Sequence, residues 1–133
     1  MRCSVYGLSL IGGALLFAGG APAGELRFPR GVDWQAVSLN QKPFAAEALP
    51  SLNVADGRAS GTTGCNRYTG NLTVNGAKLA VGPMAMTKMF CHGPGGDNER
   101  RFVSALGSAQ SWTLKDKVLT IETAHGTLRF ERK

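Results

Sequence analysis

Apolar and polar residues alternate over short stretches from Trp34 onward, and two-residue turn signals separate these stretches. Alternation with a period of two places apolar side chains on one face of a β-strand. The strongest turn signal is Asn75-Gly76, because Asn-Gly supplies the positive φ angles of a type I′ hairpin turn. A hairpin centred there gives a one-sided apolar face, pairing Val74 with Ala77 and Leu72 with Leu79.

Further two-residue turns are predicted at Asp56-Gly57, Asp116-Lys117 and His125-Gly126. The Asp116-Lys117 turn contains neither Gly nor Asn, so its prediction rests on the match of the flanking apolar side chains. The predicted pairs are Val54 with Ala59, Leu114 with Leu119, Trp112 with Ile121, Thr123 with Leu128 and Ile121 with Phe130. On the opposite face of the last hairpin, Glu122 is expected to pair with Arg129.

Residues 34–39 are predicted to form the first strand, with Trp34 as a large anchor of the core. Pro43 and Pro50 confine the next stretch to loop or edge positions, because proline has no N–H to donate to a sheet. These segments and the hairpins together indicate a mainly β domain.

One helix interrupts the strands. The run Gly93–Gly96 is expected to be a loop and Asp97 to be the N-cap of the helix. Phe102, Leu106 and Ala109 recur at helical spacing, so a helix from about 98 to about 108 should pack one face on the sheet. The sum is about eight short antiparallel strands and one packed helix, and closure into a barrel would remove the exposed sheet edges.

The N-terminal segment follows a different pattern. Arg2 precedes an apolar run at residues 5–18, which is shorter than the roughly 20 residues that span a bilayer. The run ends in Ala21-Pro22-Ala23, an A-x-A pattern typical of a secretory signal peptide, although an N-terminal membrane anchor is the alternative. Residues 1–23 are therefore predicted to be a cleaved signal peptide and residues 24–133 the single mature domain. Because Cys3 precedes the apolar run, no lipoprotein anchor is expected.

Cys65 and Cys91 remain in the mature chain, and an even pair in an exported protein favours a disulfide. The chain-entropy model gives about 3.5 kcal/mol of stabilisation for a loop of this length. A metal site that adds His92 and His125 is the weaker alternative, because the four residues lack chelating spacing. A catalytic thiol at Cys91 is also disfavoured, since Cys91 and His92 would point to opposite faces of a strand.

Composition and charge narrow the function. Hydrophobic residues make up 43% of the chain and charged residues 18%, which excludes a disordered tail, a collagen and a coiled coil. The net charge is +6, but the basic residues are scattered, so a solvated surface is the ordinary interpretation. As partners, anionic lipid headgroups or polysaccharide are favoured over nucleic acid. A Walker loop, a G-x-S-x-G elbow and a readable acid–base pair are all missing from the sequence, so neither an enzyme nor a cofactor is expected.

A methionine stripe offers one candidate ligand surface. Met84, Met86 and Met89 are most simply side chains that fill the core. Their functional alternative is an adaptable wall around an apolar ligand inside the barrel.

The sequence also carries a compound motif. Residues 57–68 contain a G-x-x-G-C-N-x-Y run, and a T-x-M-x-C run follows about twenty residues later. This combination resembles the HslJ/META-domain family of bacterial envelope proteins. The matching residues are Gly61, Gly64, Cys65, Asn66, Tyr68, Thr87, Met89 and Cys91, with further matches at Trp34 and at residues 128–131. From the residues themselves, we expect this cluster to be a structural clamp: the glycines allow a tight turn, Asn66 hydrogen-bonds the backbone, and Tyr68 buries its ring.

The resemblance implies a barrel-like fold with the broad topology of lipocalins and no enzymatic activity. It also implies a link to heat shock, envelope stress and tolerance to novobiocin, and a fold similar to that of lipid-binding pilot proteins. The sequence departs from the family in lacking the anchoring Cys of many members and the usual Gly at the Asp116-Lys117 turn. The leading hypothesis is thus a monomeric periplasmic protein that binds an envelope protein or lipid, and the alternative is a carrier of a small apolar ligand.

Overall fold

The computed structural model describes residues 27–133, so the predicted signal peptide at residues 1–23 lies outside the described residues. The strands are β1 (Trp34–Leu39), β2 (Lys42–Pro43), β3 (Ser51–Ala55), β4 (Arg58–Thr62), β5 (Arg67–Asn75), β6 (Lys78–Met86), β7 (Ala109–Lys115), β8 (Val118–Thr123) and β9 (Gly126–Arg132). One α-helix, α1 (Pro94–Leu106), connects β6 to β7, and a short 3-10 turn, η1 (Ala46–Ala48), precedes β3.

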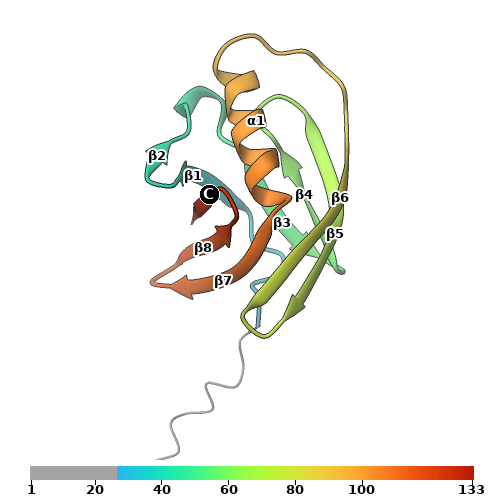
Figure 1. The fold of residues 1–133 in the computed structure, drawn as a ribbon, viewed down its shortest axis with the longest axis vertical. Coiled ribbons are helices and arrows are strands. Elements are labelled where there is room, and N and C mark those ends of the chain that lie inside the picture. Colours follow the sequence, from blue (N-terminus) through green and yellow to red (C-terminus); the bar gives the residue numbers. More distant parts are fainter. Residues whose placement is uncertain (1–26) are drawn as a thin grey trace, which may run out of the picture.

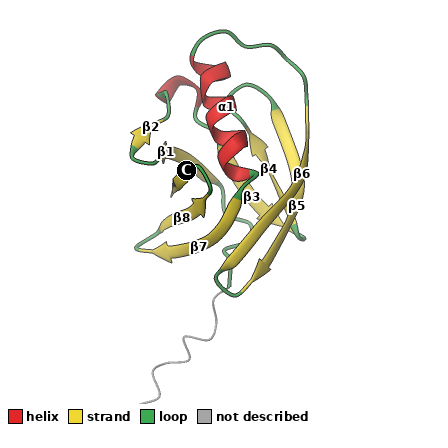
Figure 2. Ribbon diagram, viewed as in Figure 1, coloured by secondary structure: helices red, strands yellow, loops and turns green. Residues whose placement is uncertain are grey.

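The strands close into a barrel. From β3 to β9, strands that are consecutive in the chain pair with each other, and β1 pairs with both β3 and β9. This gives the closed antiparallel barrel of eight strands with one helix that the sequence predicted (Figures 1 and 2). The two-residue strand β2 lies outside the ring beside β1, so Pro43 occupies an edge strand, where its missing N–H costs no hydrogen bond.

Two hairpins have the predicted register. Val54 lies opposite Ala59, and Trp112 and Leu114 lie opposite Ile121 and Leu119. The turn residues Asp56, Gly57, Asp116 and Lys117 all have positive φ, as a type I′ turn requires. The first strand also has the predicted bounds, with the Trp34 side chain fully buried.

The β5–β6 hairpin differs from its prediction by one residue in each strand. Asn75 pairs with Lys78 and Val74 with Leu79, so the turn is Gly76-Ala77 rather than Asn75-Gly76. Gly76 has a φ of 61°, whereas Asn75 stays in the strand; glycine as first central residue is the signature of a type II′ turn. The shift keeps every side chain on its predicted face, since the pleat repeats every two residues.

The β8–β9 hairpin is shifted in the same way. Ile121 pairs with Leu128 and Thr123 with Gly126, so the turn is Ala124-His125, and the predicted pair of Glu122 with Arg129 is wrong. The Thr123 hydroxyl closes this turn: it donates to the Gly126 carbonyl at 2.7 Å and accepts from the His125 N–H at 3.0 Å. The Glu122 carboxylate accepts instead from the Thr127 hydroxyl at 2.7 Å.

The helix begins earlier than predicted. It starts at Pro94, with Gly93 rather than Asp97 as N-cap, and it ends at Leu106. Proline suits the first helical position because its missing N–H would be unpaired there anyway. The expected loop residues Gly95 and Gly96 form part of the first turn, where a Cβ would lie 2.9 Å from the Gly64 carbonyl oxygen and 2.4 Å from the Cys91 carbonyl oxygen.

Side chains fill the barrel from both ends. The helix lies across one opening (Figure 1), and its fully buried Phe102 ring lies 5.6 to 6.4 Å from the rings of Tyr68, Phe130 and Phe44. At the other end Phe28 packs edge-on against Trp112, with ring centroids 5.1 Å apart. The buried residues of strands and helix therefore form one continuous core in the part of the chain that the structure describes.

Candidate functional site

The disulfide between Cys65 and Cys91 is present, with Cα atoms 6.0 Å apart. It links the loop after β4 to the segment that runs from β6 into α1. The two parts of the sequence motif are thereby joined covalently at the end of the barrel that the helix covers.

Asn66 is the centre of the motif in space. Its amide oxygen accepts from the Met89 N–H at 2.7 Å and from the Thr87 hydroxyl at 2.9 Å. Its amide nitrogen donates to the Met89 carbonyl at 3.0 Å and to the Glu99 carboxylate at 2.9 Å. With only 4% of its surface exposed, Asn66 fastens the segment before the helix, and the helix itself, to the start of β5.

Two further residues complete this cluster without belonging to the motif. Thr63 is fully buried and donates to the Glu99 carboxylate at 2.6 Å, while its hydroxyl accepts from the N–H groups of Cys65 and Asn66. The Glu99 carboxylate, in the first turns of α1, thus receives hydrogen bonds from two side chains of the loop, Thr63 and Asn66.

A third polar residue, Asn98, was also missed. It is buried on α1, donates to the carbonyls of Ala45 and Ala48, and accepts from the Ala45 N–H. It thereby ties the helix to η1. The one available sequence signal was an amide residue in the first turns of an amphipathic helix, which does not reveal a partner so distant along the chain.

The remaining motif residues also make defined contacts. A Cβ at Gly61 would lie 2.5 Å from the Ser51 carbonyl oxygen, and one at Gly64 would lie 2.6 Å from the Ala48 carbonyl oxygen, so both glycines permit close backbone approach. The Tyr68 ring is buried, and its hydroxyl donates to the Ser51 carbonyl at 2.8 Å. Burial raises the pKa of the Tyr68 phenol well above its usual range, so the group stays neutral.

The three methionines do not form a common wall. Met84 is half-buried and touches the positions of Gly70 and Gly107, next to the core. Met86 is 39% exposed at the rim of the barrel, and Met89 is 62% exposed on the loop beyond β6. The predicted ligand wall of Met84, Met86 and Met89 is therefore not assembled.

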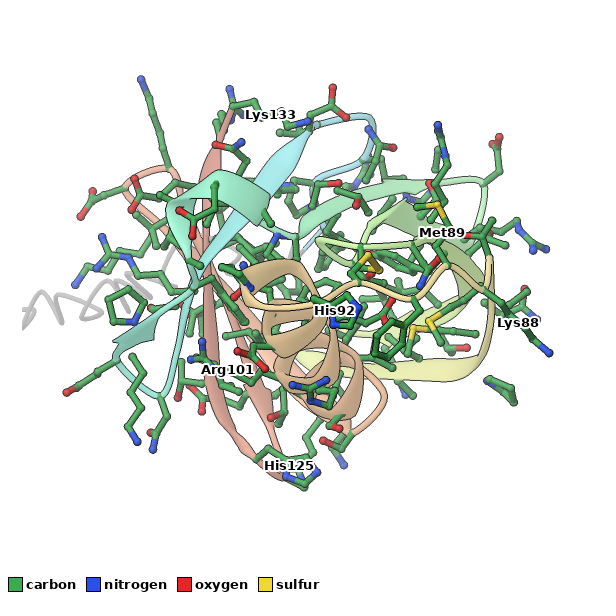
Figure 3. The ribbon with its side chains drawn as sticks, turned by 90° about the horizontal axis from the view of Figure 1, so that it is seen from above. Lys88, Met89, His92, Arg101, His125 and Lys133 are labelled. Carbon is green, nitrogen blue, oxygen red and sulfur yellow. A yellow bond between two sulfur atoms is a disulfide. The ribbon has the colours of Figure 1, made fainter. Side chains whose placement is uncertain are left out.

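Met89 instead forms an exposed pair with Phe90, which is 81% exposed; we call these two residues the apolar tip. Met89 and its neighbour Lys88 lie at the same corner of the molecule and point outward (Figure 3). The Phe90 ring packs edge-on against His92, with centroids 4.6 Å apart.

A shallow groove of about 890 Å³ lies beside this corner, over the outer faces of β3 to β6. Hydroxyl and amide side chains such as Ser60, Thr69 and Asn53 line it, with Arg67 and Met86 at the edge nearest the apolar tip. Two smaller hollows of about 520 and 470 Å³ lie at the start of α1 and beside Phe28. All three are surface features rather than an enclosed chamber.

Within residues 27–133 no group of three or more metal-binding side chains comes together. No helix in that range is long and apolar enough to cross a membrane.

A family model of the META domain matches residues 26–133. The chain belongs to the META-domain family. Two solved structures resemble this META-domain fold. One is an NMR structure that is 27% identical, with a TM-score of 0.61 over 75% of this chain and 87% of that chain. The other, from Burkholderia xenovorans, is 23% identical with a TM-score of 0.61 over 85% of this chain and 97% of its own, and it shows the fold alone. The search of curated proteins finds no match.

Proposed function

We propose that this META-domain protein is an exported, non-enzymatic protein of the bacterial envelope. It contributes to tolerance of heat, detergent or novobiocin by binding another component of the envelope through its outer surface. The signal-peptide pattern at residues 1–23 and the oxidised Cys65–Cys91 pair support export, because disulfides persist in oxidising compartments.

The apolar tip is the observation that supports binding through the outer surface. The Phe90 and Met89 side chains are large and apolar, yet both are exposed to solvent. Hydrogen bonds from Asn66 and the disulfide of Cys91 hold the backbone of this segment in place. Exposed apolar groups on a rigid support are typical of an interaction site.

The test is a deletion strain complemented with three forms of the gene: the parent, a form without residues 2–23, and a Phe90→Ser form. We expect deletion to sensitise cells to heat, detergent or novobiocin, and only the parent to restore tolerance fully. Unchanged sensitivity of the deletion strain to all three stresses would contradict the proposal. Rescue by the form without residues 2–23 would contradict export alone.

A carrier of a small apolar ligand is the second candidate, favoured by the barrel architecture that this fold shares with ligand carriers. Its site would have to open by displacement of α1, because the Phe102 side chain occupies the barrel beneath the helix.

A further inference from the structure

We propose that the apolar tip inserts into the headgroup region of an anionic phospholipid bilayer, with Lys88 and Arg67 against the lipid phosphates. This inference names the envelope component that the proposed function leaves open, and it rests on export.

The tip is exposed and does not line the hollows described above. Phe90 and Met89 lie outside the three hollows described above and are 81% and 62% exposed. A pair of large, exposed apolar side chains outside these hollows fits a deformable apolar layer, whereas a groove suits a protruding segment of a partner protein. Aromatic and long aliphatic side chains at the level of the headgroups are typical of proteins that lie on a membrane surface.

The tip is held in its exposed position. Asn66 binds both the N–H and the carbonyl of Met89, and Cys91 is bonded to Cys65 directly after Phe90. These restraints keep the two side chains from turning back onto the core. Insertion therefore needs little ordering of the loop, which removes an entropic cost of binding.

The charge around the tip favours an anionic surface. Lys88 precedes Met89, and Arg67 lies beside them because its N–H and carbonyl bond to Thr87. Neither the Lys88 nor the Arg67 side chain has an ion-pair partner among the described residues. Of the nearby carboxylates, Asp97 pairs with Arg100, whereas the hydrogen bonds found for Glu99 among the described residues come from the neutral side chains of Thr63 and Asn66. Basic residues close to an anionic leaflet each strengthen binding severalfold.

A local fluorescent reporter tests the proposal on the full chain. In a Phe90→Trp variant the new indole is exposed, while Trp34 and Trp112 are 0% and 2% exposed and give a constant background. Vesicles of phosphatidylglycerol mixed with phosphatidylcholine should shift its emission to the blue, and brominated lipids should quench it. Phosphatidylcholine alone should do neither, and added salt should weaken the response.

Leu114→Trp is the matched control, because Leu114 is 44% exposed at the β7–β8 turn, and this turn lies on the other side of the molecule from the connection between β6 and α1 (Figure 1). It should stay unshifted even if the N-terminal apolar segment tethers the chain to vesicles. Adding Lys88→Glu to Phe90→Trp should reduce the apparent affinity by about fivefold or more.

Two results would overturn the lipid assignment: no response of Phe90→Trp to anionic vesicles, or an equal response of Leu114→Trp. If Phe90→Trp does not respond but Phe90→Ser still abolishes stress tolerance, the tip binds a protein and the proposed function stands. If the vesicle response is present but deletion of the gene has no phenotype, the proposed function fails while the lipid contact is retained.

Discussion

A single buried amide side chain, that of Asn66, connects segments that lie far apart in the sequence. Four of its hydrogen bonds reach Thr87, both backbone groups of Met89, and Glu99 on the helix. Removing a partner from a buried polar group costs more than the bond itself contributed, because the remaining group is left without water. The clamp at the end of the barrel should therefore depend strongly on this one residue.

We expect Asn66→Ala to lower the free energy of unfolding by about 3 kcal/mol or more, since the Met89 N–H and the Glu99 carboxylate lose their partner. Asn71→Ala is the control, because Asn71 is exposed and its side chain accepts only a long bond from Arg58. Its effect should stay within about 0.5 kcal/mol. Denaturant unfolding of both variants measures the difference, and equal effects would rule out a clamp at Asn66.

The raised pKa of Tyr68 makes stability sensitive to alkaline pH. The phenol ionises near pH 10 in the unfolded chain but at a much higher pH in the folded one. The contribution of Tyr68 to the free energy of unfolding is therefore complete below about pH 10, and it declines as pH rises further because only the unfolded chain then loses the proton. We expect the free energy of unfolding to fall by up to about 1.4 kcal/mol for each pH unit above that value.

Tyr68→Phe should remove this alkaline loss while costing about 1 kcal/mol at neutral pH, because the bond to the Ser51 carbonyl is lost. Denaturant unfolding of the two proteins from about pH 9 to about pH 11 gives both slopes. Parallel slopes would show that Tyr68 does not cause the pH dependence.

Sequence reasoning identified part of this cluster. The pairing of Cys65 with Cys91 followed from the cysteine count and the export signal, and the polar tip of a buried Tyr68 followed from its chemistry. Thr63 and Glu99 gave no comparable signal, because each has a common local role in a turn or a helix start. Their shared bond, across residues 36 positions apart, appears only once the helix packs on the loop.

At the scale of the elements, the predictions that failed were hairpin registers inferred from glycine-containing turn signals. Asp56-Gly57 has the predicted register, but Asn75-Gly76 and His125-Gly126 do not. In the last hairpin, Gly126 serves a tertiary contact instead of the turn, because a Cβ there would lie 2.8 Å from the Asn40 Cβ. A glycine signal in sequence thus does not distinguish a turn from a close approach.

The β7–β8 turn provides a test of this reasoning, since Asp116 and Lys117 hold φ angles of 52° and 64° without glycine. A non-glycine residue in the left-handed backbone conformation is strained by roughly 1–2 kcal/mol, and a glycine avoids this strain. About half of that gain is offset, because glycine has more conformational freedom in the unfolded chain and loses more of it on folding. We expect Lys117→Gly to raise the free energy of unfolding by about 0.5 kcal/mol and Lys115→Gly, within the strand, to lower it. A loss of stability in Lys117→Gly would contradict a strained turn.

At the scale of the whole molecule, the pattern of short strands in the sequence predicted that the sheet closes into a barrel. It did not predict which side chains fill the interior of that barrel. The alternation of apolar residues predicts an inward face for each strand, and joining the faces predicts a barrel. It does not say that α1 lies across one opening with Phe102 among the rings of Phe44, Tyr68 and Phe130. The position of Phe102 bears on which proposed function applies, because a ligand carried inside the barrel would need the space that this ring occupies.

Phe102→Ala tests this distinction. Deleting the ring from a fully buried site should cost about 3 to 5 kcal/mol and leave a cavity lined by aromatic side chains. A fluorescent fatty acid should then bind the variant but not the parent, since in the parent the Phe102 ring occupies the space beneath the helix. Ser104→Ala, exposed on the same helix, should resemble the parent in both unfolding and binding. If the variant does not fold, Phe102→Leu opens a smaller space at lower cost. A parent protein that binds the fatty acid as tightly as the variant would instead support a carrier whose helix moves aside.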